Sequence, residues 1–407
     1  MQRCFCRITA GALALCLTLF SAQTARGYAF NQIVPDLRLS ASVAGTSACP
    51  IPAHQLTAAG SLTVQWSTIL GTNPVTILTL NQSTSGQLSE IEQVIQQSLN
   101  VWTGVSGSML QPAVLAPLVR SASANICAAD GRNSICFDQS DAAFTPGVLA
   151  FSRVLTADHI GAQVGSGAPA TELGEILDAD LYFNPGDSRI TFATPQALAS
   201  SPTAYDLESI LTHELGHLFG FSHSAVWSAM MDPFAPVPGT YTGARPTVSQ
   251  PDAPLGEDDR TGLRVLYPSA GDTTHIGTIT GRVLPANPLS LPAAPAGVTG
   301  IFGAHVVAVD ASSGAVIAGV LGGWSCSGAG PPQFDGSYRF ERLAVGAAQS
   351  YQVYAEPLNG AVDPAAVDNA LSTLCRNLLT DPGWPANFAC VVPPVDTEFT
   401  TRARTSP

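Results

Sequence analysis

The chain has 407 residues, of which 45% are hydrophobic and only 12% are charged, and its formal net charge is −13. This composition supplies enough apolar side chains for two folded domains and excludes a wholly disordered chain. Every basic residue is arginine, and an acidic chain without lysine is a poor partner for a phosphate backbone, so we expect no nucleic-acid partner.

Residues 1–27 have the pattern of a secretory signal peptide. Arginines precede an apolar run at 8–20 that is too short for a membrane span, and the small residues Ala25 and Gly27 precede the expected cleavage site. An uncleaved anchor is the alternative. We therefore expect a secreted, extracellular protein with no transmembrane segment in the mature chain.

The cysteines support export. Three of the nine lie in the signal segment, which leaves an even number for disulfide bonds in an oxidising compartment. Cys127 and Cys136 flank a turn-rich insert and form the first expected disulfide, and Cys375 with Cys390 forms the second. The remaining two, either bonded to each other or free, are Cys49 and Cys326.

Residues 28–61 are polar and have no clear period, so we expect a propeptide or an N-terminal extension there. The first folded domain is expected to begin at residue 62. Residues 88–102 place apolar side chains at helical spacing on one face and predict a helix. Alternating, β-branched stretches predict strands at 75–80, 134–139, 147–154 and 178–184.

The most informative stretch is LTHELGHLFGFSH, which ends at His223. His213 and His217 are four residues apart, so on a helix both imidazoles project from one face, roughly 6 Å apart along the axis. That spacing suits two nitrogen ligands of one tetrahedral Zn²⁺. Glu214 points in a neighbouring direction, from which it can reach a metal-bound water without binding the metal.

The third histidine, His223, lies six residues beyond His217 and in a continued helix would project about 240° away, on the far side. Gly220 stands where the chain must leave the helix, because glycine accepts the left-handed conformation that ends helices. The alternative is a solvated helix face. The added glycine and histidine match by chance only about once in 10³, so the motif predicts a zinc site.

HELGHLFGFSH resembles the signature of the metzincin peptidases, and the SAVWSAMMDP that follows resembles the matrixin branch. Met231 stands where matrixins have their Met-turn, as an apolar floor beneath the zinc. Ser224 follows the third histidine, where astacins usually have Glu and adamalysins Asp. The resemblance covers residues 62–268 and implies an α+β metzincin domain, with a twisted mixed sheet and an active-site helix.

By the same resemblance, the strand at 147–154 is the antiparallel edge strand, and the backbone of Leu149 and Ala150 would pair with an extended peptide substrate. Matrixins usually hold a second, structural zinc through three histidines near this strand. This chain has only His159 there, so we expect one zinc. Cys49 lies in SACPIP, which departs from the PRCGxPD latch of the family, and we favour a disulfide role for it.

Two further segments complete the resemblance. Residues 234–254 are rich in proline and glycine and correspond to the wall of the pocket for the side chain after the cut bond. Residues 255–268 resemble the closing helix of matrixins.

A calcium site is a further candidate, because several oxygen-bearing side chains precede the active-site helix. A capped strand end with a turn at Pro185 and Gly186 is the alternative that we favour. The candidate ligands are Asp178, Asp180, Asn184 and Asp187.

After a linker at 269–276, alternating stretches separated by turn residues predict an all-β antiparallel sandwich at 277–358. Its DGSYRFERLAVG segment resembles the carboxypeptidase regulatory-like, prealbumin-type sandwich family. This domain would either bind a cell-surface or matrix ligand or only stabilise the chain. The sequence favours neither role over the other. Residues 359–407 are a C-terminal extension or a further part of the sandwich, and the linker predicts that residues up to about 270 fold alone.

These features together predict a secreted, monomeric zinc endopeptidase that acts on a protein or peptide substrate. His213, His217 and His223 would hold the zinc, and Glu214 would take a proton from the attacking water and pass it to the leaving amine. A zinc amidase acting on cell-wall peptides is one alternative. A non-proteolytic surface-binding protein that keeps the site is another, although the presence of Glu214 speaks against it.

Overall fold

The structure is a computed structural model that describes the central part of the chain almost continuously and the ends in short segments. The described residues are 4–6, 23–24, 30, 32–33, 51–55, 62–67, 75–80, 84–110, 114–118, 127–137, 144, 147–185, 189–269, 275–284, 300, 304–323, 325–326, 335–346, 349–356 and 397–400. Cys49, Cys375 and Cys390 lie outside them. Within the described part, no helix is both long and apolar enough to cross a membrane.

The chain divides into two compact units. One unit contains residues 53–222, 230–255 and 396–407. The other contains residues 1–52, 223–229 and 256–395. The helix within residues 255–268, predicted as the closing helix, packs against two of the C-terminal strands and lies in the same unit as they do.

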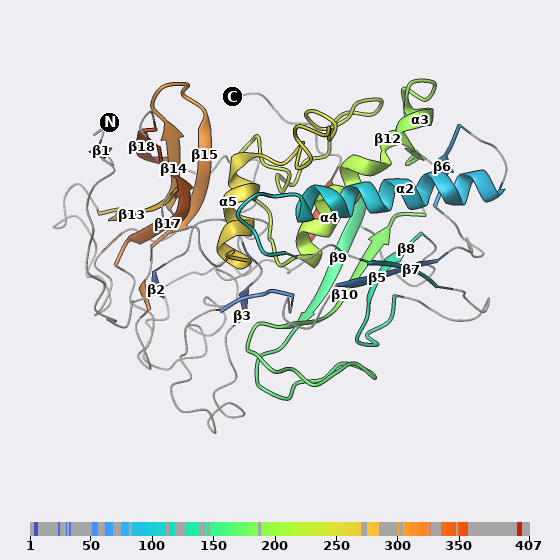
Figure 1. Ribbon diagram of the computed structural model, residues 1–407, viewed down its shortest axis with the longest axis horizontal. Helices are drawn as coiled ribbons and strands as arrows, with labels where there is room; N and C mark the ends of the chain where they lie inside the picture. Colours follow the sequence, from blue (N-terminus) through green and yellow to red (C-terminus); the bar gives the residue numbers. More distant parts are fainter. Residues whose placement is uncertain are drawn as a thin grey trace. The chain divides into compact units, whose positions relative to one another are not determined.

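The first unit is built on a six-stranded mixed sheet (Figure 1). Its inner strands pair in parallel, and β9 pairs antiparallel with β10, as the resemblance implied. In sheet order the strands are β19 (Thr397–Thr400), β9 (Val148–Thr156), β10 (Ile176–Phe183), β8 (Asn133–Cys136), β5 (Thr63–Ser67) and β7 (Val114–Leu118). The predictions for β8, β9 and β10 are confirmed to within a few residues, whereas β5 and β7 were not predicted.

Helix α2 (Thr84–Thr103) connects the parallel strands β5 and β7, which need a long crossover of this kind. Its predicted apolar face is buried, as at Ile95, Leu99 and Trp102. Helix α4 (Leu207–Leu218) lies beside α2 and packs on β9 and β10 (Figure 1). The indole Nε1 of Trp102 donates to the carbonyl of Thr212 at 2.8 Å and joins the two helices.

A small parallel sheet and a short helix lead into α4. The helix is α3 (Pro195–Leu198), and the strands, in sheet order, are β12 (Tyr205–Asp206), β11 (Phe192–Ala193) and β6 (Ile77–Leu78). Strand β12 ends directly where α4 begins, so this sheet fixes the first turn of the active-site helix.

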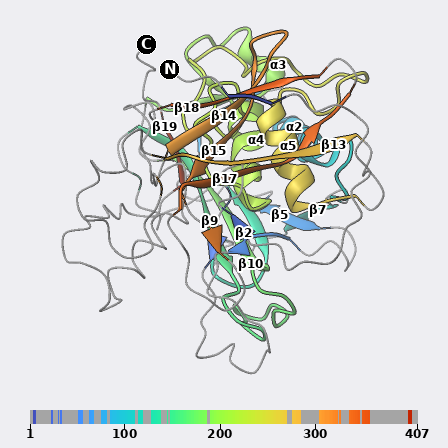
Figure 2. The same ribbon diagram turned by 90° about the vertical axis from the view of Figure 1, so that its left-hand side faces the viewer.

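The second unit contains helix α5 and antiparallel strands, which Figure 2 shows with β14 beside β15 and β18. The paired strands are β13 (Ile276–Arg282) with β17 (Ser337–Ala344), and β18 (Tyr351–Glu356) with β14 (Ala304–Asp310) and β15 (Val316–Gly322). The helix is α5 (Glu257–Leu266). Antiparallel pairing agrees with the predicted strand pattern, whereas the likeness to prealbumin-type sandwiches stays a prediction.

Short strands complete this unit. They are β3 (Gln32–Ile33) with β4 (Ile51–Pro52), β16 (Ser325–Cys326) with β2 (Gln23–Thr24), and β1 (Cys4–Cys6) on the outer side of β18. Because β1 and β2 lie within residues 1–27, export with cleavage of the predicted signal would remove both of them.

The predicted disulfide between Cys127 and Cys136 is confirmed, with 6.2 Å between the two Cα atoms. Both cysteines are buried and pack against the ring of Tyr182, whose hydroxyl donates to the carbonyl of Cys127 at 2.8 Å. The backbone amides of Asp130 and Gly131, within the closed loop, donate to the carboxylate of Asp178. The disulfide therefore holds a loop that covers one end of β10.

Replacing Cys127 and Cys136 together by alanine should lower the free energy of unfolding by about 2–3 kcal/mol, because a closed loop of this length restricts the unfolded chain by that amount. Urea unfolding followed by tryptophan fluorescence measures the difference. An unchanged unfolding midpoint would contradict the assignment, provided that thiol titration shows the double variant to have lost the two cysteines.

A buried carboxylate on β10, paired with an arginine on β9, makes stability depend on pH. The side chain of Asp180 is fully buried and accepts from Arg153 at 2.6 Å. Burial, with a smaller contribution from Asp178, raises the pKa of Asp180 from 3.8 to about 8, against the opposing effect of Arg153. The folded chain then binds more protons at Asp180 than the unfolded chain between these two values, so stability should fall as the pH rises through that window.

The substitution Asp180→Asn removes this titration, so the variant should gain stability relative to the native chain when the pH is raised from about 5 to about 8. Urea unfolding at both pH values gives the comparison. Two stability curves that run parallel across this range would show that burial does not control the ionisation of Asp180.

Candidate metal centre

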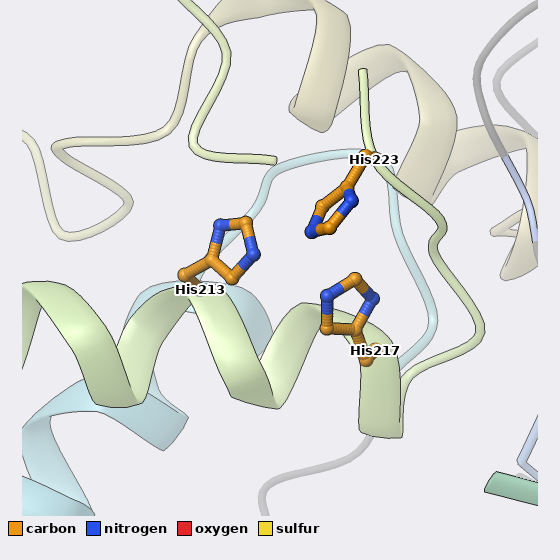
Figure 3. Close-up of side chains that lie close together, drawn as sticks. All are labelled: His213, His217 and His223. Carbon is orange, nitrogen blue, oxygen red and sulfur yellow. The ribbon is translucent and has the colours of Figure 1, made fainter. Parts of the chain in front are cut away.

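Helix α4 presents His213 and His217 from its last two turns, and both side chains are fully buried. The helix begins after Asp206, whose carboxylate accepts from the amide of Ser209 at 2.8 Å. This N-cap satisfies one of the free amides of the first turn. Figure 3 shows the two imidazoles projecting from the same side of α4, as their spacing predicted.

The chain leaves the helix at Gly220, which has φ of 100°. The amide of Gly220 donates to the carbonyl of His217 at 2.9 Å, and the amide of Phe221 donates to that of Gly216 at 3.0 Å. A Cβ atom at Gly220 would collide with the carbonyl oxygen of Ala53, so both the conformation and the space require glycine. Helix α4 therefore ends at Leu218, and the chain turns at Gly220.

Beyond this break, His223 returns towards the helix, and its ring faces those of His213 and His217 (Figure 3). One ligand atom from each of the three imidazoles lies within 4.8 Å of the others. All three side chains are buried, and among the described residues this is the cluster of metal-binding side chains that the structure brings together. The sequence-predicted triad is thus assembled in space.

Backbone carbonyls orient two of the rings. Nδ1 of His213 lies 2.8 Å from the carbonyl oxygen of Met230, and Nδ1 of His217 lies 2.8 Å from that of Phe221. In a neutral imidazole a donating Nδ1 places the lone pair on Nε2, which is the form that binds a metal. Burial lowers the pKa of His217 to about 4, so this ring is held neutral. Three converging imidazoles are a donor set that suits zinc.

Glu214 is fully buried beside the histidines, and burial raises its pKa to about 8. The hydroxyl of Ser152, on β9, donates to Oε2 of Glu214 at 2.7 Å and opposes this rise. The other oxygen, Oε1, is buried and has no hydrogen-bond partner among the described residues. Ser152 thus orients the carboxylate and leaves one oxygen available.

Ser152 was not predicted as part of the site. It is two residues beyond Ala150 on the expected edge strand, so strand alternation alone places both on one face. A hydroxyl on the face of β9 that meets α4 was the signal that could have identified it.

Met231 packs beneath α4. A Cβ atom on Gly216 would collide with Sδ of Met231 and would lie 2.7 Å from Cζ2 of Trp102. The thioether and the indole therefore approach the helix backbone between the two histidines, which explains a glycine that the sequence reasoning did not single out. The close approach agrees with the role expected for Met231 as an apolar floor.

Strand β9 carries Leu149 and Ala150, both fully buried, but it is not the outermost strand of the sheet. The C-terminal strand β19 pairs antiparallel with its outer side, with Phe399 opposite Ala150. The prediction that β9 is a free edge strand is corrected, because β19 already pairs with it. The unpaired backbone groups of an edge strand accept an extended segment of the same chain as readily as a separate peptide.

The segment after Met231 is anchored to the first turn of α4. The guanidinium of Arg245 pairs with the carboxylates of Asp206 and Glu208 and stacks on the ring of Tyr241, 4.0 Å from its centroid. The amide of Thr242 donates to the hydroxyl of Ser209 at 3.0 Å. These contacts fix the segment that the resemblance assigns to the substrate pocket.

The candidate calcium ligands have partners within the protein. Asp178 accepts from two backbone amides, Asp180 pairs with Arg153, and the side-chain amide of Asn184 donates to the carbonyl of Val148 at 2.7 Å. Asp187 lies outside the described residues. Oδ1 of Asp178 and Oδ1 of Asp180 are buried without a hydrogen-bond partner among the described residues, so the capped strand end and the calcium site both stay predictions. His159, which the sequence places just after the strand, has Nδ1 2.7 Å from the carboxylate of Asp158.

Comparison with known proteins identifies the region around this site. The model of the family described as Matrixin matches residues 152–268. Metalloendoproteinase 1-MMP of Arabidopsis thaliana is 35% identical over 99 residues, which are 22% of this chain and 24% of that protein. The chain thus matches about a quarter of the length of this relative. Residues 152–268, which include the three histidines and Glu214, are therefore similar to the matrixin peptidases.

Proposed function

We propose that the chain is a secreted zinc endopeptidase that hydrolyses peptide bonds in a protein or peptide substrate. The observation that carries this proposal is the convergence of three buried imidazoles within 4.8 Å, beside a glutamate with one uncommitted oxygen. The similarity of residues 152–268 to matrixins supports the same activity.

His213, His217 and His223 would hold one zinc ion, and the carbonyl contacts of the first two would keep their Nε2 atoms directed at it. When bound, zinc polarises the scissile carbonyl and makes water acidic enough to attack near neutral pH. Burial of the site in an apolar surround strengthens both effects, since electrostatic interactions are larger at low effective dielectric constant.

Glu214 would act as the general base. Its Oε1 would take a proton from the attacking water and then pass that proton to the leaving amine, while Oε2 stays held by Ser152. A carboxylate that is already fixed through one oxygen loses little conformational freedom when it reacts. We therefore assign to Ser152 the role of orienting Glu214.

An extended substrate would bind antiparallel to the outer side of β9, where Leu149 and Ala150 lie. The pairing of β19 with the same backbone supports this mode, because it has the hydrogen-bonding pattern of strand addition. A substrate that used the whole length of β9 would have to displace β19.

Export is the second part of the proposal. It is supported by the signal-like residues 1–27 and by the disulfide between Cys127 and Cys136, which is typical of an oxidising compartment. For residues 277–358 we propose an antiparallel sandwich that accompanies the peptidase region.

A pair of substitutions separates the metal from the chemistry. Glu214→Ala should keep about one zinc per chain and lower the turnover number by at least about 10²–10⁴, the range of a positioned proton-transfer group. His217→Ala should lose zinc as well as activity, because it removes one of three protein ligands. Metal analysis and cleavage of a peptide library measure the two effects.

The exposed Glu92 on α2 offers a matched control, and Glu92→Ala should retain both zinc and turnover. Full activity in Glu214→Ala would refute the proposed base. Loss of zinc in Glu214→Ala to the same extent as in His217→Ala would make Glu214 a ligand instead.

The substitution Ser152→Ala should lower the turnover number about 10-fold while zinc content stays unchanged, because a hydrogen bond to a charged group contributes about 1.5–3 kcal/mol, of which part is recovered by relaxation. Ser134, on β8, is also fully buried, and its hydroxyl has no partner among the described residues, so Ser134→Ala is the matched control. Equal turnover in the two variants would show that Ser152 does not orient Glu214.

A further inference from the structure

The loop that follows the third histidine, residues 223–229, is held from within by Ser224. Its hydroxyl accepts from the amide of Val226 at 3.1 Å and donates to Oδ2 of Asp258 at 2.7 Å. All three residues are buried. Ser224 is covalently next to His223, so whatever fixes Ser224 also restricts the position of the third imidazole.

Asp258 lies in the first turn of α5, and its second oxygen has a different partner. Oδ1 accepts from the backbone amide of Gly319 at 2.8 Å, and Gly319 belongs to β15. Strand β15 is the last strand of its sheet, so its outward amides need a partner from outside the sheet. One carboxylate therefore bonds the loop through one oxygen and the C-terminal sheet through the other.

The contact between β15 and the loop is close enough to require glycine at position 319. A Cβ atom there would lie 2.6 Å from Cγ2 of Val226 and 2.7 Å from Nε2 of His305, which are distances that real Cβ atoms do not show. Val226 and His305 are both buried and come from the loop and from β14. A residue with a Cβ atom at position 319 would not let the strand approach the loop in this way.

We propose that Asp258 is a positioning residue, through which strand β15 holds the loop that carries the third zinc-binding histidine. This inference rests on the proposed zinc site. It assigns the C-terminal sheet a part in the metal centre, and it contradicts the expectation that residues up to about 270 form a complete catalytic unit, because such a fragment lacks Gly319.

The full-length chain offers a matched pair of glycine substitutions on the same strand. Gly319→Ala places a methyl group against Val226 and His305, whereas at Gly322 the nearest atom to an added Cβ is Cβ of Tyr338 at 3.2 Å, away from the loop. We expect Gly319→Ala to weaken zinc binding about 10–100-fold, the range found when a group that supports a metal ligand is lost, and Gly322→Ala to leave it unchanged.

Asp258 is tested in the same assay. Asp258→Ala removes both hydrogen bonds and should weaken zinc binding to the same degree as Gly319→Ala. Asp258→Asn keeps an acceptor for Gly319 and a polar partner for Ser224, so it should restore most of the affinity. Competition with a chromophoric chelator gives the zinc dissociation constant, and cleavage of one peptide gives kcat and KM, of which kcat should fall and KM should change little.

Hydrogen exchange of the metal-free full-length chain gives a readout independent of zinc and of activity. The peptide that spans residues 223–229 should exchange faster in Gly319→Ala and Asp258→Ala than in the native chain or in Gly322→Ala, because the amide of Val226 loses its fixed partner. If one of the variants does not fold, the other and Asp258→Asn still decide the question.

The proposed zinc peptidase function and the proposed positioning role of Asp258 can be refuted separately. A native chain that binds no zinc and cleaves no peptide would refute the proposed function, while the exchange measurement would still test the contact. A native chain that binds zinc, with Gly319→Ala and Asp258→Ala unchanged in both affinity and exchange, would refute the positioning role of Asp258 and leave the peptidase intact.

Discussion

The site depends on holding three neutral imidazoles together in the protein interior. A charged imidazole in so buried a position would be costly, so the rings must stay neutral and must point their free nitrogens at one another. Backbone carbonyls select this tautomer for His213 and His217. The turn at Gly220 then supplies the third ring, and only a residue without a Cβ atom fits beside Ala53 at that turn.

The packing around α4 fits the need to hold the imidazoles in fixed positions. Gly216 lets Met231 and Trp102 approach the helix backbone between the two histidines, and the indole of Trp102 bonds the carbonyl of Thr212. Tight packing of this kind leaves the helix little freedom to shift, since interiors are as dense as organic crystals. Within this packing, one oxygen of Glu214 accepts from Ser152 and the other has no hydrogen-bond partner among the described residues.

The rigid helix carries two of the histidines, whereas the third comes from a loop that needs its own support. Asp258 supplies it by bonding Ser224 and the amide of Gly319 with its two oxygens. The compact units reflect this, because residues 223–229 and α5 group with the C-terminal strands. Support of this kind would give the loop ligand the rigidity that a helix gives to the other two.

The sequence alone determined the features that depend on near neighbours. The spacing of His213 and His217, the break at Gly220 and the disulfide across a short insert follow from helix geometry and local chain reversal, which a few residues specify. The tertiary structure decided the contacts that join distant segments. Ser152 meets Glu214 across 62 residues and Asp258 meets Gly319 across 61, and such pairs depend on strand order and helix packing, which no local pattern encodes. For the same reason the free edge expected at β9 is paired in the folded chain, since that edge depends on where the C-terminal strand settles.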